Sequence, residues 1–207
     1  MRFKPLSQIR QVHPGIHAFT LFSEAECAAI LREVDRKRDG REEAPNSMNK
    51  YGADLSEIGM QRLANALARD VVAPLAAGLY PDVGPLKKPY GFLVDYSHKQ
   101  RSLNPHIDEP SAVTLNVCLG RDFEGGRLVF KGLRCGRHDA VRYRPDEHFE
   151  VEHVIGRAIL HRGHHLHQAR PIDHGRRTNL ILWCGAKIKS RKHPVWCNAV
   201  SAQSLCA

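Results

Sequence analysis

The chain has 207 residues and a formal net charge of +9, with 42% hydrophobic and 26% charged residues. This length suits one globular domain, and no run approaches the roughly 18 consecutive apolar residues that a membrane helix requires. The basic residues are spread along the chain apart from a cluster at residues 187–192, which favours a basic solvated surface over a nucleic-acid groove.

The cysteines and the N-terminus indicate the compartment. None of the six cysteines forms a C-x-x-C pair, which argues against a structural zinc ribbon. The first five residues lack the apolar core of a secretory signal. We therefore expect reduced thiols in an intracellular, cytoplasmic protein that has no membrane partner.

Two helical stretches are predicted before residue 89. Ser23-Glu24-Ala25-Glu26 is a capping-box pattern that opens an amphipathic run over 25–34, and Asp39-Gly40 ends it. A second stretch, rich in Ala and Leu, covers 56–79, with Pro74 dividing it. Residues 81–89 are interpreted as a linker. The sequence thus predicts a helical N-terminal support over about residues 16–88.

After residue 89 the hydrophobic period changes from helical to strand-like, and the chain is predicted to form a β core over 89–185 followed by a basic tail over 186–207. Short strands separated by turns and preceded by helices indicate an α+β fold, a sandwich or jelly roll buttressed by helices, within a single domain spanning 1–207. The predicted strands are 90–97, 112–119, 127–130, 151–154, 158–160, 166–169 and 178–184.

Histidines and a carboxylate in this half are candidate metal ligands. His106 and Asp108 are two residues apart, so on a strand both side chains face one way. Taken alone, this pair is more typical of a histidine next to an aspartate in a surface loop. A second group of histidines, at positions 161, 164, 165 and 167, lies before Pro171, and periodicity leaves open which of them is a ligand. Two imidazoles and one carboxylate are the donors of a mononuclear non-haem iron(II) site.

Spacing sets His167 apart from the other three histidines. Pro171, Gly175 and Arg177 follow it by four, eight and ten residues. With the H-x-D pair and the Gly125-Gly126 turn before a strand, this resembles the 2-oxoglutarate- and Fe(II)-dependent dioxygenases. It is most similar to their prolyl-4-hydroxylase-like and lysyl-hydroxylase-like domains, and to proteins described as 2-oxoglutarate- and iron-dependent oxygenase domain-containing. The resemblance covers about residues 16–185 and implies a double-stranded β-helix, or jelly roll, with N-terminal helices packed on the major sheet.

The resemblance implies a role for each matched residue. His106, Asp108 and His167 would be the iron ligands, and Arg177 would bind the distal (C5) carboxylate of 2-oxoglutarate. A guanidinium suits this task because it is planar, always charged and able to bind a carboxylate through two hydrogen bonds.

Five further residues are candidates for the co-substrate pocket. Tyr96 lies ten residues before His106, where the family often has a tyrosine that contacts the co-substrate, although a core aromatic explains it equally well. Thr114, Asn116 and Cys118 share the strand face that the fold would turn towards the pocket. Asn179 stands where prolyl hydroxylases often have Ser or Thr, and Cys118 where some have Tyr, so close analogy to those enzymes is weakened at both positions.

The resemblance implies hydroxylation of an unactivated C–H bond, coupled to decarboxylation of 2-oxoglutarate to succinate. Fe(II), 2-oxoglutarate and O₂ would be required, with ascorbate as a reductant. The substrate would be an amino-acid side chain, protein-bound or free, and cationic loops at 40–55, 97–105 and 131–149 suit an anionic or zwitterionic one. Alternatives are a natural-product hydroxylase, a non-catalytic binding module, and a zinc protein using the histidines with Cys184 or Cys197. Neither the substrate's identity nor the oligomeric state follows from the sequence.

Overall fold

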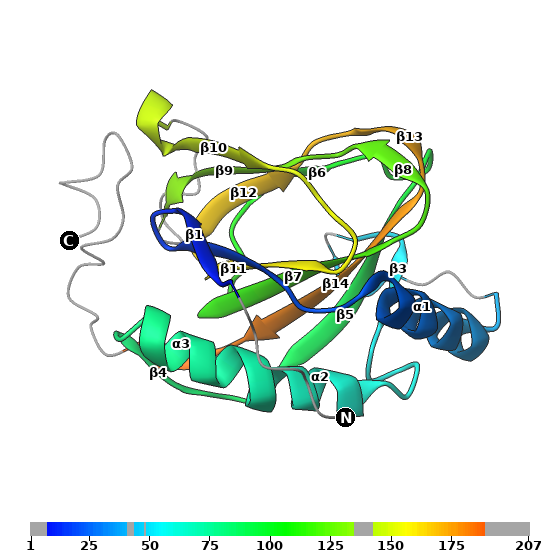
Figure 1. Cartoon of the computed structure of the whole chain (residues 1–207), viewed down its shortest axis with the longest axis horizontal. Helices are drawn as coiled ribbons and strands as arrows, with labels where there is room; N and C mark the ends of the chain where they lie inside the picture. The colour runs from blue at the N-terminus through cyan, green and yellow to red at the C-terminus, as the bar shows by residue number, and fades with distance from the viewer. Residues whose placement is uncertain (1–7, 41–43, 48, 135–142, 189–207) are drawn as a thin grey trace.

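Two antiparallel sheets face each other, and helices lie against the outer face of the larger one (Figure 1). This architecture comes from a computed structural model that describes residues 8–40, 44–47, 49–134 and 143–188. The prediction of N-terminal helices combined with a two-sheet β core is therefore confirmed at this level.

The larger sheet has seven strands in the order β1-β2-β11-β7-β14-β5-β3. β7 is buried along its whole length because its two faces meet different layers. Val113, Leu115 and Val117 pack into the core beneath the helices, whereas Thr114 and Asn116 point to the opposite face. The strands are β1 (Arg10–His13), β2 (Ile16–Thr20), β3 (Gly52–Asp54), β5 (Tyr90–Tyr96), β7 (Val113–Gly120), β11 (Arg157–Arg162) and β14 (Arg177–Cys184).

The smaller sheet has four strands in the order β10-β9-β12-β6, which places β6 at an edge. It comprises β6 (Leu103–His106), β9 (Leu128–Leu133), β10 (His148–Val151) and β12 (His165–Ala169), with the short helix η2 (Pro145–Glu147) before β10. Two further pairs join β8 (Phe123–Gly125) to β13 (Ile172–Gly175) and β4 (Val83–Leu86) to β15 (Ala186–Ile188).

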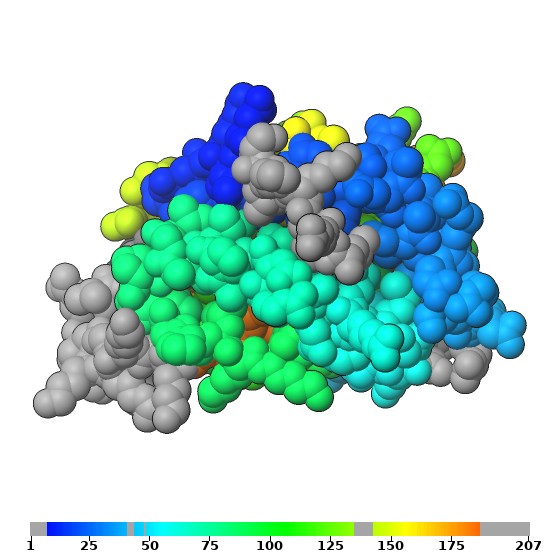
Figure 2. Space-filling model, turned by 60° about the horizontal axis from the view of Figure 1, so that its bottom comes forward, coloured from blue at the N-terminus to red at the C-terminus, as the bar shows by residue number. Residues whose placement is uncertain are grey.

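The helices cover one face of the molecule (Figures 1 and 2). α1 (Glu24–Arg38) begins at the predicted capping box, in which Ser23 Oγ and Glu26 Oε2 each accept a hydrogen bond from the other residue's backbone N–H. It ends at Asp39, whose backbone is left-handed with a φ of 48°. α2 (Gln61–Leu67), the π-helical turn η1 (Ala68–Val72) and α3 (Ala73–Leu79) follow, and apolar residues between the helices and the larger sheet form the main core.

The structure corrects the prediction that residues 16–88 are helical support alone. β2 and β3 lie within this range and join the larger sheet, and the supposed linker at 81–89 contains β4. β4 includes Gly84 and Pro85, which are typical of turns, and its pairing with β15 is a contact between distant parts of the chain.

Two boundaries also differ from prediction. The second helical stretch runs without a gap from α2 through the π-helical η1 to α3, so the irregular turn lies just before Pro74, which stands in the first turn of α3 and does not divide the stretch. The strand expected at 151–154 is displaced to 148–151, where it pairs with β9.

Among the described residues, no helix is long and apolar enough to cross a membrane. Cys27, Cys118 and Cys184 are buried free thiols. The other three cysteines and all but the first residues of the basic tail lie outside the described residues.

Candidate functional site

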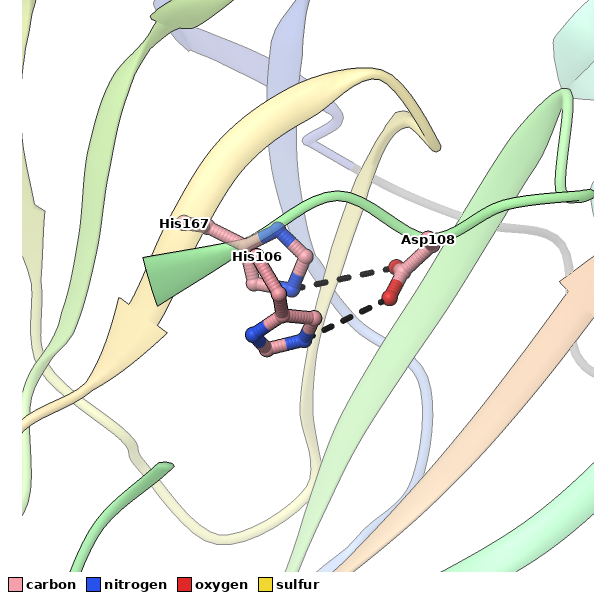
Figure 3. A group of neighbouring side chains, drawn as sticks. All are labelled: His106, Asp108 and His167. Atoms are coloured by element: carbon pink, nitrogen blue, oxygen red, sulfur yellow. Dashed lines mark ion pairs between the residues drawn. The ribbon is translucent and has the colours of Figure 1, made fainter. Parts of the chain in front are cut away.

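His106, Asp108 and His167 converge between the two sheets (Figure 3). His106 ends β6, Asp108 lies in the loop that follows, and His167 lies in β12 directly opposite His106 in the strand register. Each residue offers one ligand atom, and these atoms all lie within 4.8 Å of one another. The Nε2 atoms of His106 and His167 are 3.6 and 3.8 Å from the Asp108 carboxylate oxygens. The structure thus brings together the three residues that the sequence selected.

Hydrogen bonds orient each of the three side chains. His106 Nδ1 lies 2.7 Å from the carbonyl oxygen of Asn104, and His167 Nδ1 lies 2.8 Å from that of His165. A proton on each Nδ1 satisfies these carbonyls and leaves the Nε2 lone pairs directed at Asp108. Thr114 Oγ1 donates to Asp108 Oδ2 at 2.7 Å and fixes the carboxylate.

Electrostatics keep this group ready to bind a cation. Burial alone would raise the pKa of Asp108, but the neighbouring His167 and His106 hold that pKa below its usual range. Burial lowers the pKa of His167 to about 3, so its imidazole is neutral at physiological pH. A carboxylate and two imidazoles on one side of a cavity fit the donor set of mononuclear Fe(II).

The other histidines near the site are not part of this group. His161 and His165 are fully buried in the structure, and the ring centroids of His161 and His167 are 4.9 Å apart. Within the described part of the chain, the group of three or more metal-ligating side chains whose ligand atoms converge consists of His106, Asp108 and His167. The zinc alternative built on residues 161–167 gains no support.

A buried cation, Arg177, opens β14 beside this site. Its side chain has no exposed surface and lies 4.4 Å from the centroid of the Tyr96 ring and 5.5 Å from that of Phe123. Nη1 donates to the carbonyl oxygen of Gly126, whereas Nε and Nη2 have no partner. Burial lowers the pKa of Arg177. Among the described residues no carboxylate pairs with this buried guanidinium, and two of its nitrogens lack a hydrogen-bond partner, which makes it a strong candidate anion site.

The glycine turn explains how Arg177 reaches its position. Gly126 has a φ of +69°, and a Cβ built there would lie 2.3 Å from Arg177 Nη1. A side chain at residue 126 would therefore displace the guanidinium. Gly126 of the Gly-Gly turn thus leaves the space that Arg177 occupies, whereas a Cβ at Gly125 would meet Asp173.

The remaining predicted pocket residues divide into two groups. Tyr96, Thr114 and Asn116 line the cavity that contains the three candidate ligands. Asn179 and Cys118 are paired across β14 and β7 and are buried near Arg177, outside the residues that line this cavity. The Asn179 amide nitrogen donates to Asn116 Oδ1 at 2.6 Å, so it is already engaged.

Sequence reasoning missed three residues at the site. Asn49 and Trp183 line the cavity, and Asn49 Oδ1 and Trp183 Nε1 are buried without a hydrogen-bond partner. His153 Nδ1 lies 3.3 Å from the Asn179 amide, and burial together with the charge of Arg177 holds its pKa well below 6.5. None carries a local motif, because each reaches the site only through the fold.

The comparisons with known proteins agree with the geometry. Residues 3–85 match the family model of the OGFOD2-like domain. The chain is 38% identical over 187 residues to the 2-oxoglutarate and iron-dependent oxygenase domain-containing protein ICU11 of Arabidopsis thaliana, covering 86% of this chain and 47% of that protein. It is also 38% identical over 189 residues to the 2-oxoglutarate and iron-dependent oxygenase domain-containing protein 2 of Homo sapiens, covering 88% and 52%. The chain spans about half the length of these curated relatives.

The fold recurs in solved structures of low sequence identity. A prolyl hydroxylase from Trichoplax adhaerens, in complex with a peptide fragment of a hypoxia inducible factor oxygen degradation domain, matches with a TM-score of 0.62 and 14% identity. The match covers 85% of this chain and 86% of that one. Sequence and fold together confirm the resemblance to the 2-oxoglutarate- and Fe(II)-dependent dioxygenases.

Proposed function

We propose that this relative of the 2-oxoglutarate and iron-dependent oxygenase domain-containing proteins is itself a 2-oxoglutarate- and Fe(II)-dependent dioxygenase. It would hydroxylate an unactivated C–H bond of an amino-acid side chain, and O₂ and 2-oxoglutarate would be converted to the new hydroxyl group, succinate and CO₂. The observation that carries the proposal is the convergence of His106, Asp108 and His167 beside the buried, unpaired Arg177.

The chain's own residues would position both small molecules. His106, Asp108 and His167 would hold Fe(II) at the wall of the cavity. When bound, Fe(II) supplies the activation of O₂ that couples oxidation of the co-substrate to that of the substrate. Arg177 directs Nε and Nη2 at the distal carboxylate of 2-oxoglutarate, and ascorbate serves as a reductant of the iron.

Neighbouring side chains would tune this arrangement. Thr114 holds Asp108 in its ligating orientation, and Tyr96 covers one face of the Arg177 guanidinium. Asn116 and Asn179, which are joined by a hydrogen bond, would lie on the co-substrate side. Cys118 would lie behind them as a protonated thiol, because burial raises the pKa of Cys118. Apolar residues of the cavity wall, including Phe92, limit access of water to the reacting bond.

We place these functions in one domain. The two facing sheets would form the double-stranded β-helix of a single domain, in which β1, β2 and β3 from the N-terminal part join the strands of residues 89–185 and a basic tail follows at 186–207. The free thiols of Cys27 and Cys184 support an intracellular, cytoplasmic location.

A protein or amino-acid-like substrate is supported by the Trichoplax match, since that enzyme was solved with a peptide. A natural-product hydroxylase and a binding module without catalysis are the alternatives. We propose neither a nucleic-acid nor a membrane partner.

Succinate release from 2-oxoglutarate tests the proposal. Purified protein with Fe(II), O₂ and ascorbate should release succinate, even slowly without substrate. His167→Ala should abolish release, and His164→Ala, which alters a neighbouring histidine outside the ligand group, should retain it. Equal loss in both variants would refute the ligand assignment, and no release from the unmodified protein would favour a binding module.

A further inference from the structure

A wider groove adjoins the cavity at the candidate iron ligands. It has a volume of about 480 Å³ and is lined by Lys50 and residues 99–106, which we call the outer groove. Leu103 and His106 line both spaces, so a molecule lying in the outer groove reaches the metal centre. The inner cavity is mainly apolar, whereas the outer groove is polar and charged.

The outer groove carries only positive charge. Its lining includes Lys50, Lys99 and Arg101 and contains neither Asp nor Glu. Within the described residues, neither Lys50 nor Arg101 forms a salt bridge with a carboxylate. Lys50 and Arg101, two like charges on one groove, therefore attract an anionic ligand.

Hydrogen bonds hold the Arg101 side chain and the Lys50 backbone at the outer groove. Arg101 Nε and Nη2 both donate to the carbonyl oxygen of Ile172, at 3.0 and 2.8 Å, which leaves further N–H groups for a ligand. The backbone N–H of Lys50 donates to Gln100 Oε1 at 3.0 Å, and the Gln100 amide nitrogen is buried without a partner. Lys99 Nζ lies 5.7 Å from the centroid of the Tyr51 ring.

The shape of the outer groove favours an extended polypeptide. Residues 103–106 of its wall are β6, the edge strand of the four-stranded sheet. An extended peptide can lie along such an edge strand. Pro105 has no N–H and the Asn104 carbonyl already lies 2.7 Å from His106 Nδ1, so side-chain contacts rather than a continuous backbone ladder would hold the peptide. The lining contains no Phe, Tyr or Trp, and its one histidine, His106, is a candidate iron ligand, so it offers little of the aromatic stacking surface that single-stranded nucleic acid uses.

We propose that the outer groove binds an acidic segment of polypeptide alongside β6. Carboxylates of this segment pair with Lys50 and Arg101, and a neighbouring side chain enters the apolar cavity. The site would then select acidic sequences. The selection of a side chain for hydroxylation rests on the proposed function, whereas the binding of the acidic segment does not.

Fluorescence anisotropy with labelled peptides tests this inference. The probe is a fluorescein-labelled 12-residue peptide of Glu and Ala with one Pro and one Lys at its centre. Its partner has Gln in place of every Glu. The protein is loaded with Mn(II) and 2-oxoglutarate, so that binding is measured without turnover. We expect the acidic peptide to bind about tenfold more tightly, with an affinity that falls as salt is raised.

Matched variants locate the binding. Lys50→Glu with Arg101→Gln should lower the affinity for the acidic peptide about tenfold. Lys87→Glu with Lys88→Gln makes the same change in net charge at exposed residues after β4 and should leave binding unchanged. Circular dichroism confirms that both variants are folded.

Three results would overturn the inference: equal affinity for the two peptides, equal loss in both charge variants, or tighter binding of a labelled single-stranded RNA of the same charge. A peptide preference without any succinate release would contradict only the proposed function. Succinate release without a peptide preference would contradict only the acidic-segment inference.

Discussion

Arg177 is an unusual residue because it is completely buried, cationic and only partly hydrogen-bonded. A buried charge without a counter-charge costs several kcal/mol in a folded protein, so this arrangement indicates that an anion completes the site. Tyr96 and Gly126 shape the space around the guanidinium. The exposed neighbour, Arg176, instead pairs with Asp95 at 3.2 Å.

Arg177→Lys should weaken 2-oxoglutarate binding by at least about tenfold, because an ammonium keeps the charge but loses one of two charge-assisted hydrogen bonds. An anaerobic titration of the Fe(II)-loaded protein with 2-oxoglutarate measures the change. Arg176→Lys is the matched control and should bind normally. Unchanged affinity in Arg177→Lys would place the co-substrate carboxylate elsewhere.

Thr114→Val should lower the affinity for Fe(II) by roughly tenfold, because it removes the hydrogen bond that orients Asp108 while preserving the side chain's shape. Equilibrium dialysis of Fe(II) under anaerobic conditions gives the dissociation constant. Thr20→Val, at an exposed position at the end of β2, controls for the substitution itself. A Thr114→Val protein with normal Fe(II) affinity would show that Asp108 needs no such support.

At the scale of elements, α1 is fastened to the larger sheet by a buried ion pair. Arg38 Nη1 lies 2.6 Å from Asp95 Oδ2 on β5, and Asp95 Oδ1 accepts a 2.6 Å hydrogen bond from Thr178 on β14. Burial alone would raise the pKa of Asp95, but these two partners hold it below its usual value. Because Thr178 follows Arg177, the same contact helps to fix the start of β14.

Asp95→Asn should destabilise the fold by about 3 kcal/mol at pH 7, since it removes the carboxylate that lies 2.6 Å from the buried Arg38 guanidinium. A group whose pKa is lowered on folding contributes stability above its unfolded pKa of about 3.9 and loses it as the pH falls through the folded value. The difference between wild type and variant should therefore shrink below about pH 4. Urea unfolding between pH 3 and 7 measures it. A difference independent of pH would contradict the ionised pair.

Elements with strong local patterns were predictable from the sequence, and those made by distant pairing were not. The capping box fixed the start of α1, and alternation located β5, β7 and β14 within a few residues. β4 was missed because its Gly and Pro are turn formers that only β15 holds in a strand.

The site divides in the same way. The two histidines, Asp108 and Arg177 stand at recognisable spacings in the second half of the sequence, so the sequence carries their pattern although they lie on both sheets and one loop. Asn49 and Trp183 come from segments far apart in the chain, and no spacing rule could have joined them.

At the scale of the whole molecule, folding should be coupled to the binding of metal and co-substrate. The candidate metal-binding residues come from strands of the small sheet and the loop after β6, whereas Arg177 comes from the large sheet. Mn(II) with 2-oxoglutarate at about 100 times its dissociation constant should stabilise the fold by about 2.7 kcal/mol, which raises Tm by roughly 5–10 °C. His167→Ala should show no such rise. A rise of equal size in this variant would mean that the ligands bind elsewhere.

Two anaerobic measurements on one sample test the proposed centre most directly. One is the visible charge-transfer band of Fe(II) with 2-oxoglutarate, and the other is the iron content of the protein. We expect one Fe(II) per chain and a band that saturates with 2-oxoglutarate in the wild type and in His164→Ala. Both should be lost in His167→Ala. A band that persists in His167→Ala, or that never forms in a wild-type protein containing iron, would contradict the assignment of His106, Asp108, His167 and Arg177 to one dioxygenase site.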